Sequence, residues 1–71
     1  MKIEKFDEYT KGWVRGIAFA MYYLIENRDE PTLAFELARE SGVSKTDLTK
    51  AHVDSLEKKA IYKAMRKEGV K

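Results

Sequence analysis

Few side chains in the 71-residue sequence are of the types that carry out catalysis or bind metal ions. The chain has one histidine, His52, no cysteine and no glycine-rich loop, which leaves no basis for a thiolate nucleophile, a histidine-based triad or a phosphate-binding loop. His52 with Asp54, or Glu36 with Glu40 one helical turn apart, would each supply two ligands, whereas a metal site normally has three or four. We therefore expect no enzyme activity, metal site, cofactor or small-molecule substrate.

The longest apolar stretch, residues 12–25 with the sequence GWVRGIAFAMYYLI, carries more apolar side chains than one helix face can bury. Its uninterrupted part, residues 17–25, is far shorter than the roughly 20 residues that a membrane-spanning helix needs. The chain opens without the segments of a signal peptide, and the absence of cysteine fits a reducing compartment. We therefore expect a cytoplasmic protein without membrane contact.

Residues 4–27 are predicted to form the first helix, because apolar side chains recur at a spacing of three to four residues. The residues on its broad apolar side are predicted to face the core: Phe6, Tyr9, Trp13, Val14, Ile17, Ala20, Met21, Leu24 and Ile25. The remaining polar side chains and Tyr22 are left for solvent. This helix is therefore expected to organise the domain.

A narrower second strip of the same helix contains Gly12, Gly16, Phe19 and Tyr23, with Ala20 at its border. A glycine inside a helix costs about 1 kcal/mol relative to alanine, so two glycines four residues apart indicate a close approach by another helix. Either a neighbouring helix of the same chain or a helix of another molecule would fill this groove. Both alternatives stay open at the level of the sequence.

Three further helices are predicted at residues 31–41, 45–51 and 55–68. Asp29 or Glu30 would cap the helix at 31–41, and Pro31 would lie in its first turn. Gly42 would end this helix in the left-handed backbone conformation. The sequence S-x-x-D at residues 44–47 is a variant capping box that opens the next helix. One continuous helix over residues 45–68 is the alternative.

Each of these helices also has a predicted apolar side. The apolar side of the helix at 31–41 consists of Leu33, Ala34, Phe35, Leu37 and Ala38, and that of the last helix, with the residue before it, of Val53, Leu56, Ala60, Ile61 and Ala64. No strand pattern or repeat is present. We therefore expect residues 1–71 to form a single all-α domain of three to four helices.

The net charge of +2 hides an uneven distribution of charge along the chain. Residues 26–47 contain three basic and six acidic side chains, a balance of −3, whereas residues 55–71 contain six basic and two acidic ones, a balance of +4. A basic surface is predicted beside Tyr62, formed by His52, Lys59, Lys63 and Arg66. It would bind phosphates or an acidic protein face, or it is the solvated side of an amphipathic helix.

The stretch E36-L-A-R-E-S-G-V-S-K-T-D-L-T-K-A51 resembles a helix-turn-helix unit. In that family a small residue packs the two helices together, a glycine makes the turn and an aliphatic residue completes the core. Ala38, Gly42 and Leu48 hold these positions. The long first helix would then pack on this helix-turn-helix-like pair and on the last helix.

The resemblance implies a recognition helix that presents Lys45, Thr46, Thr49 and Lys50 to a DNA major groove. However, the segment that would approach DNA is the acidic part of the chain, and phosphate contacts normally dominate DNA affinity through Lys and Arg. A helix-turn-helix transcriptional regulator is therefore the alternative function.

The sequence pattern D29-E-P-T-x-A34, followed by E40-S-G42 and D47-L48, is similar to patterns in small orphan proteins of bacteriophages and prophages. This similarity implies a mobile-element source and a non-enzymatic protein that binds a host protein or a promoter. The leading expectation is a protein-contact module that binds a host protein or itself, as a homodimer, through Gly12, Gly16, Phe19, Ala20 and Tyr23.

Overall fold

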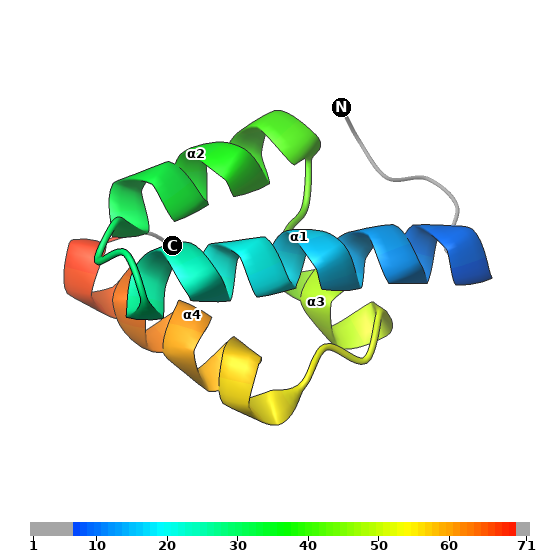
Figure 1. The fold of residues 1–71 in the computed structure, drawn as a ribbon. Helices are drawn as coiled ribbons and strands as arrows, with labels where there is room; N and C mark the ends of the chain where they lie inside the picture. Colours follow the sequence, from blue (N-terminus) through cyan, green and yellow to red (C-terminus); the bar gives the residue numbers. More distant parts are fainter. Residues whose placement is uncertain (1–6, 70–71) are drawn as a thin grey trace.

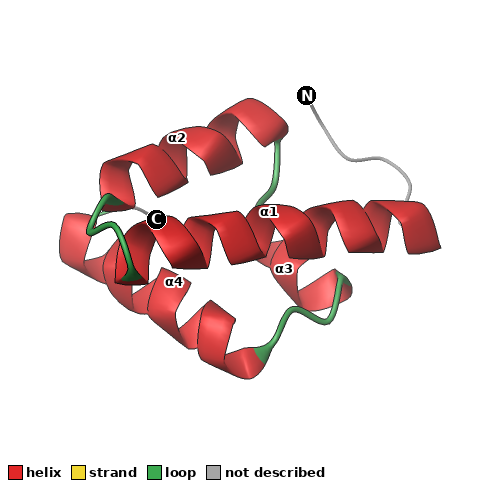
Figure 2. Ribbon diagram, in the orientation of Figure 1, coloured by secondary structure: helices red, strands yellow, loops and turns green. Residues whose placement is uncertain are grey.

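The computed structural model describes residues 7–69 and shows four α-helices joined by short loops (Figure 1). The helices are α1 (Glu8–Glu26), α2 (Pro31–Ser41), α3 (Lys45–Lys50) and α4 (Ser55–Glu68). Within these residues there is no strand, which confirms the all-α class (Figure 2). The loop at residues 51–54 separates α3 from α4, so the alternative of one continuous helix is wrong.

Helix α1 is the element against which the other described helices pack. In Figure 1 α2 lies above α1 and α4 lies below it, and α1 takes part in every extensive contact between two described helices. At about 1.5 Å per residue its 19 residues span about 28 Å, close to the 31 Å long dimension of the molecule. The fold is therefore three helices packed against one shared helix.

Side-chain caps and left-handed turns set most helix ends where the sequence predicts them. Ser44 and Asp47 form the predicted capping box at the start of α3, and Asp54 caps α4 by accepting a hydrogen bond from the Leu56 N–H at 2.8 Å. Gly42 ends α2 with φ of 78°, as predicted. Glu30, one of the two predicted caps, is the N-cap residue of α2, but its side chain makes no capping hydrogen bond.

The core is built largely from small side chains. Its buried apolar residues are Val14, Ala18, Met21, Ala34, Ala38, Val43, Leu48, Ala51, Val53, Ile61, Ala64 and Met65. Five of these twelve are alanines, which allow helix axes to approach closely. The largest fully buried side chains are Met21, Leu48, Ile61 and Val14.

The predicted core face of α1 is wrong at one edge. Tyr9 is 83% exposed, whereas Ala18, which was not assigned to the core face, is fully buried. At about 100° per residue, the buried arc around Val14, Ala18 and Met21 is turned by about 70° from the predicted arc around Ile17. Residue Phe6 of the predicted face lies outside the described residues.

The predicted apolar sides of α2 and α4 are also wrong in part. Leu33 and Leu56 were assigned to apolar sides but are 45% and 65% exposed, whereas Met65, which was not assigned, is buried. Ala34 and Ala38 of α2 and Ile61 and Ala64 of α4 are buried, as predicted. Each of these helices therefore buries part of its predicted apolar side and leaves one leucine at the surface.

This arrangement predicts opposite outcomes for two leucine truncations. Leu48→Ala removes a fully buried side chain and should lower the free energy of unfolding by about 2–5 kcal/mol. Leu56→Ala, the matched control on the exposed face of α4, should change it by less than about 0.5 kcal/mol. Urea denaturation followed by circular dichroism measures both, and an equal loss in the two variants would contradict this packing.

Candidate functional site

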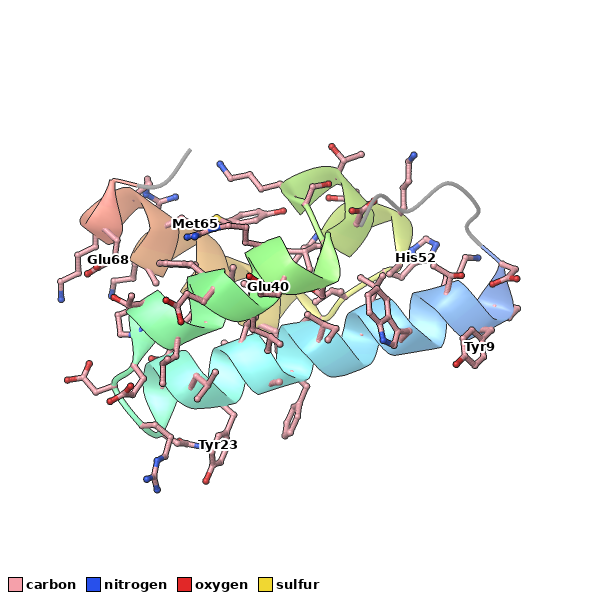
Figure 3. All side chains as sticks on the ribbon, turned by 90° about the horizontal axis from the view of Figure 1, so that it is seen from above. Tyr9, Tyr23, Glu40, His52, Met65 and Glu68 are labelled. Atoms are coloured by element: carbon pink, nitrogen blue, oxygen red, sulfur yellow. The ribbon has the colours of Figure 1, made fainter. Side chains whose placement is uncertain are left out.

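The strip of α1 that contains the two glycines faces solvent in the described structure. Gly12 and Gly16 are exposed, and Phe19 and Tyr23 are 57% and 43% exposed. Tyr9 joins this strip, and Figure 3 shows that Tyr9 and Tyr23 both project from the side of α1 turned away from the other helices. We define the outer face of α1 as Tyr9, Gly12, Gly16, Phe19, Ala20 and Tyr23.

No part of the described chain fills the groove at the two glycines. A Cβ atom built on Gly12 or Gly16 would meet nothing within 4 Å beyond the helix's own backbone and the adjacent residues. The alternative that a neighbouring helix of the same chain packs there is therefore wrong for residues 7–69. Among the described residues, the space beside the two glycines is therefore unoccupied.

Five of the six residues of the outer face, all except Phe19, have a spacing that is the same in both directions along the helix. Tyr9, Gly12, Gly16, Ala20 and Tyr23 follow one another at intervals of three, four, four and three residues. Aromatic side chains lie at both ends and small residues in the middle. Sequence reasoning missed this symmetry because it assigned Tyr9 to the core.

The charged side chains beside the outer face are engaged by their own chain. The Arg15 Nε donates a hydrogen bond to the Ala51 carbonyl at 2.6 Å, which ties α1 to the residue that ends α3. Lys11 forms an ion pair with Glu8 at 3.3 Å. Hydrogen bonds to a charged donor are stronger than neutral ones, so Arg15 is held against the end of α3.

The apolar residues of the segment at 36–51 pack inward, and its glycine lies in a turn. Ala38, Val43 and Leu48 are buried, and Gly42 takes the left-handed conformation in the turn between α2 and α3. The N–H of Val43 donates to the Ala38 carbonyl at 3.1 Å. The turn is therefore closed by its own hydrogen bonds.

The side chains predicted to read DNA are brought together on the surface of α3. Lys45, Thr46, Thr49 and Lys50 are all exposed. The Lys45 ammonium lies 5.6 Å from the centre of the Tyr62 ring, and the Tyr62 hydroxyl donates to the Lys45 carbonyl at 3.5 Å. The acidic side chain in this helix, Asp47, accepts hydrogen bonds from Ser44, so its charge serves the helix N-terminus.

The predicted basic surface is only partly assembled. Lys59, Lys63 and Arg66 lie exposed along α4, but His52 belongs to the turn before this helix, with φ of 57°. Helical spacing therefore does not extend to His52. The three cations on α4 have no carboxylate within 4.0 Å among the described residues.

The two residue pairs considered as metal ligands lie at exposed positions of the structure. Asp54 caps α4, and His52 is exposed in the adjacent turn. Glu36 and Glu40 are exposed on α2, and the described residues contain no group of three metal-binding side chains. Partial burial raises the pKa of the nearby Glu57 carboxyl above its usual value, and the Asp54 carboxylate raises it further.

Comparison with protein-family models, curated proteins and solved structures finds no match to this chain. None of the described helices combines the length and apolarity needed to cross a bilayer.

The empty space at Gly12 and Gly16 predicts that alanine is tolerated there within the monomer. Gly16→Ala should raise the free energy of unfolding by about 0.5–1 kcal/mol, because alanine favours the helix and meets no neighbour. Gly42→Ala, the matched control at φ of 78°, should instead lower it by about 1 kcal/mol. Urea denaturation at low protein concentration would contradict this assignment if Gly16→Ala were destabilising.

Proposed function

We propose that the protein is a small non-catalytic module that acts by protein–protein contact, with the outer face of α1 as its binding surface and a second copy of the chain as its partner. The observation that supports this proposal is the solvent-exposed run of aromatic and small residues on α1. Two glycines within it leave the backbone open to close approach.

The symmetric spacing of the outer face supports self-association of antiparallel α1 helices. A two-fold axis through Gly16 would place residues equally distant from Gly16 opposite each other, so Gly12 would face Ala20 of the partner subunit. Tyr9 would face Tyr23 of the partner subunit. Small residues would then meet in the middle of the contact and aromatic residues would pair at both ends, each pair contributing about 0.5–1.5 kcal/mol beyond buried area.

The size of the chain also favours a partner. A 71-residue domain without disulfides is near the lower limit for a stable core, and here much of that core is alanine. Covering Tyr9, Phe19 and Tyr23 would remove apolar surface from water at about 25 cal/mol per Å². Association through α1 would thus add stability that the core alone supplies poorly.

The dimer predicts that a large side chain at Gly16 prevents association without unfolding the chain. Gly16→Leu should be monomeric and helical, because the monomer has space at this position but a close helix pair does not. Gly16→Ala is the matched control and should remain a dimer, since small residues are compatible with close packing. Light scattering measures the mass of each variant, and a parent chain that is monomeric at all concentrations would contradict self-association.

Single cysteines in this cysteine-free chain can report the register. Gly16→Cys should form a disulfide with itself under oxidation, because a residue on a two-fold axis faces its own copy. Gly12→Cys should crosslink to Ala20→Cys in a mixture more readily than either variant crosslinks to itself. A parallel dimer would reverse this preference, and a monomeric parent would direct attention to a helix of a host protein, as the similarity to phage proteins implies.

Sequence-specific DNA binding is the second candidate function, and one observation favours it. Four polar side chains that the helix-turn-helix pattern assigns to base contacts are exposed together on α3, namely Lys45, Thr46, Thr49 and Lys50. The acidic residue of this helix is engaged as part of the capping box. We propose on this basis that a dimer formed through α1 presents two copies of α3 to two half-sites.

DNA binding through α3 predicts a steep dependence on salt. Lys45→Ala and Lys50→Ala should each weaken binding to duplex DNA and lower the slope of log K against log salt by about 1. Lys11→Ala on α1 is the control, because Lys11 is paired with Glu8 outside the α3 surface and should leave the slope unchanged. Fluorescence anisotropy measures the affinity, and the absence of any binding at low salt would exclude this function.

A further inference from the structure

The outer surface of α2 has an acidic stripe that follows a leucine. Leu33, Glu36 and Glu40 are separated by three and four residues and fall within an arc of about 60° on the helix. Leu33 is 45% exposed, and neither carboxylate has a cation within 4.0 Å among the described residues. We call these three residues the acidic stripe.

The outer surface of α4 has the same pattern with the opposite charge. Leu56, Lys59 and Lys63 have the same separations and the same arc, and Leu56 is 65% exposed. Neither ammonium has a carboxylate within 4.0 Å among the described residues. We call these three residues the basic stripe.

A shallow groove accompanies the basic stripe. It runs between the end of α1 and α4 and is lined by Glu26, Leu56, Lys59, Ala60, Lys63 and Arg66. Its floor includes the small side chain of Ala60, and its rim is mostly cationic. An amphipathic helix with a leucine and acidic side chains fits such a groove by shape and by charge.

We infer that the acidic stripe of one copy of this protein docks on the basic stripe of another. Aligned in the same direction, the two stripes place Leu33 against the partner's Leu56. Glu36 then meets the partner's Lys59, and Glu40 meets the partner's Lys63. All charges on the two stripes are paired in this register, and both exposed leucines are covered.

This contact joins copies head to tail. In Figure 1 α2 lies above α1 and α4 lies below it, and the stripes are on the exposed sides of these two helices, so one molecule presents them in different directions. Such a heterologous contact uses two different surfaces and extends a chain of molecules or closes a ring. It leaves the outer face of α1 free and does not depend on the proposed α1 dimer.

The contact is weak and sensitive to salt. Exposed ion pairs contribute little individually and are screened as ionic strength rises. Association should therefore grow with protein concentration at about 0.01 M salt, where the Debye length is about 30 Å, and disappear at about 1 M salt, where it is about 3 Å.

The inference can be tested by reversing the charges of each stripe and measuring association by sedimentation equilibrium. These variants are made in the Gly16→Leu background, which leaves both stripes intact. Reversing the acidic stripe with Glu36→Lys and Glu40→Lys should weaken association at least about tenfold, and so should Lys59→Glu with Lys63→Glu. Mixing the two reversed proteins should restore association. The fourfold exchange should restore it within one protein while keeping the net charge of +2, which controls for total charge.

A proximity measurement in the parent background gives the second arm of the test. Glu36→Cys and Lys59→Cys should form a mixed disulfide with each other in preference to disulfides with themselves. The inference is overturned if the Gly16→Leu protein keeps one mass at all concentrations in low salt, or if reversed proteins associate as strongly as the parent. Failure of the α1 dimer appears separately, as a Gly16→Cys variant that does not crosslink to itself.

Discussion

The packing of every other helix against α1 is the constraint on which the structure depends. Helices α2, α3 and α4 make their extensive contacts with α1 rather than with one another. One side of α1 must therefore serve three partners, which explains why Val14, Ala18 and Met21 are almost completely buried. With α1 shared in this way, no described helix remains to cover its opposite side.

Small side chains make this shared packing possible. Ala18, Ala34 and Ala51 are fully buried, so the backbones of their helices come close together. Larger apolar side chains such as Leu33 and Leu56 lie exposed on the outer sides of α2 and α4. The structure therefore combines a core rich in alanine with apolar side chains that remain in contact with solvent.

The helices could be predicted from the sequence because their ends are encoded locally. The Ser44–Asp47 capping box and the left-handed Gly42 need only neighbouring residues, and both are present in the structure. The direction in which each helix faces could not be predicted equally well. Apolar residues cover most of α1, so the sequence does not determine which part of the helix surface is buried. Large side chains are expected in the core before small ones, which favours Tyr9 over Ala18. The structure shows the reverse, because Ala18 is buried and Tyr9 is exposed.

The features that could not be predicted from the sequence depend on residues that are far apart in the chain. The hydrogen bond from Arg15 to the Ala51 carbonyl joins residues 36 positions apart, and the types of these two residues do not predict it. Whether the groove at Gly16 is empty likewise depends on where α2 and α4 lie, not on the residues of α1. The folding of a small domain is only marginally favourable. A partner that binds the folded form alone stabilises that form further. A molecule that covered the exposed apolar surfaces of the folded chain alone would therefore also stabilise the fold.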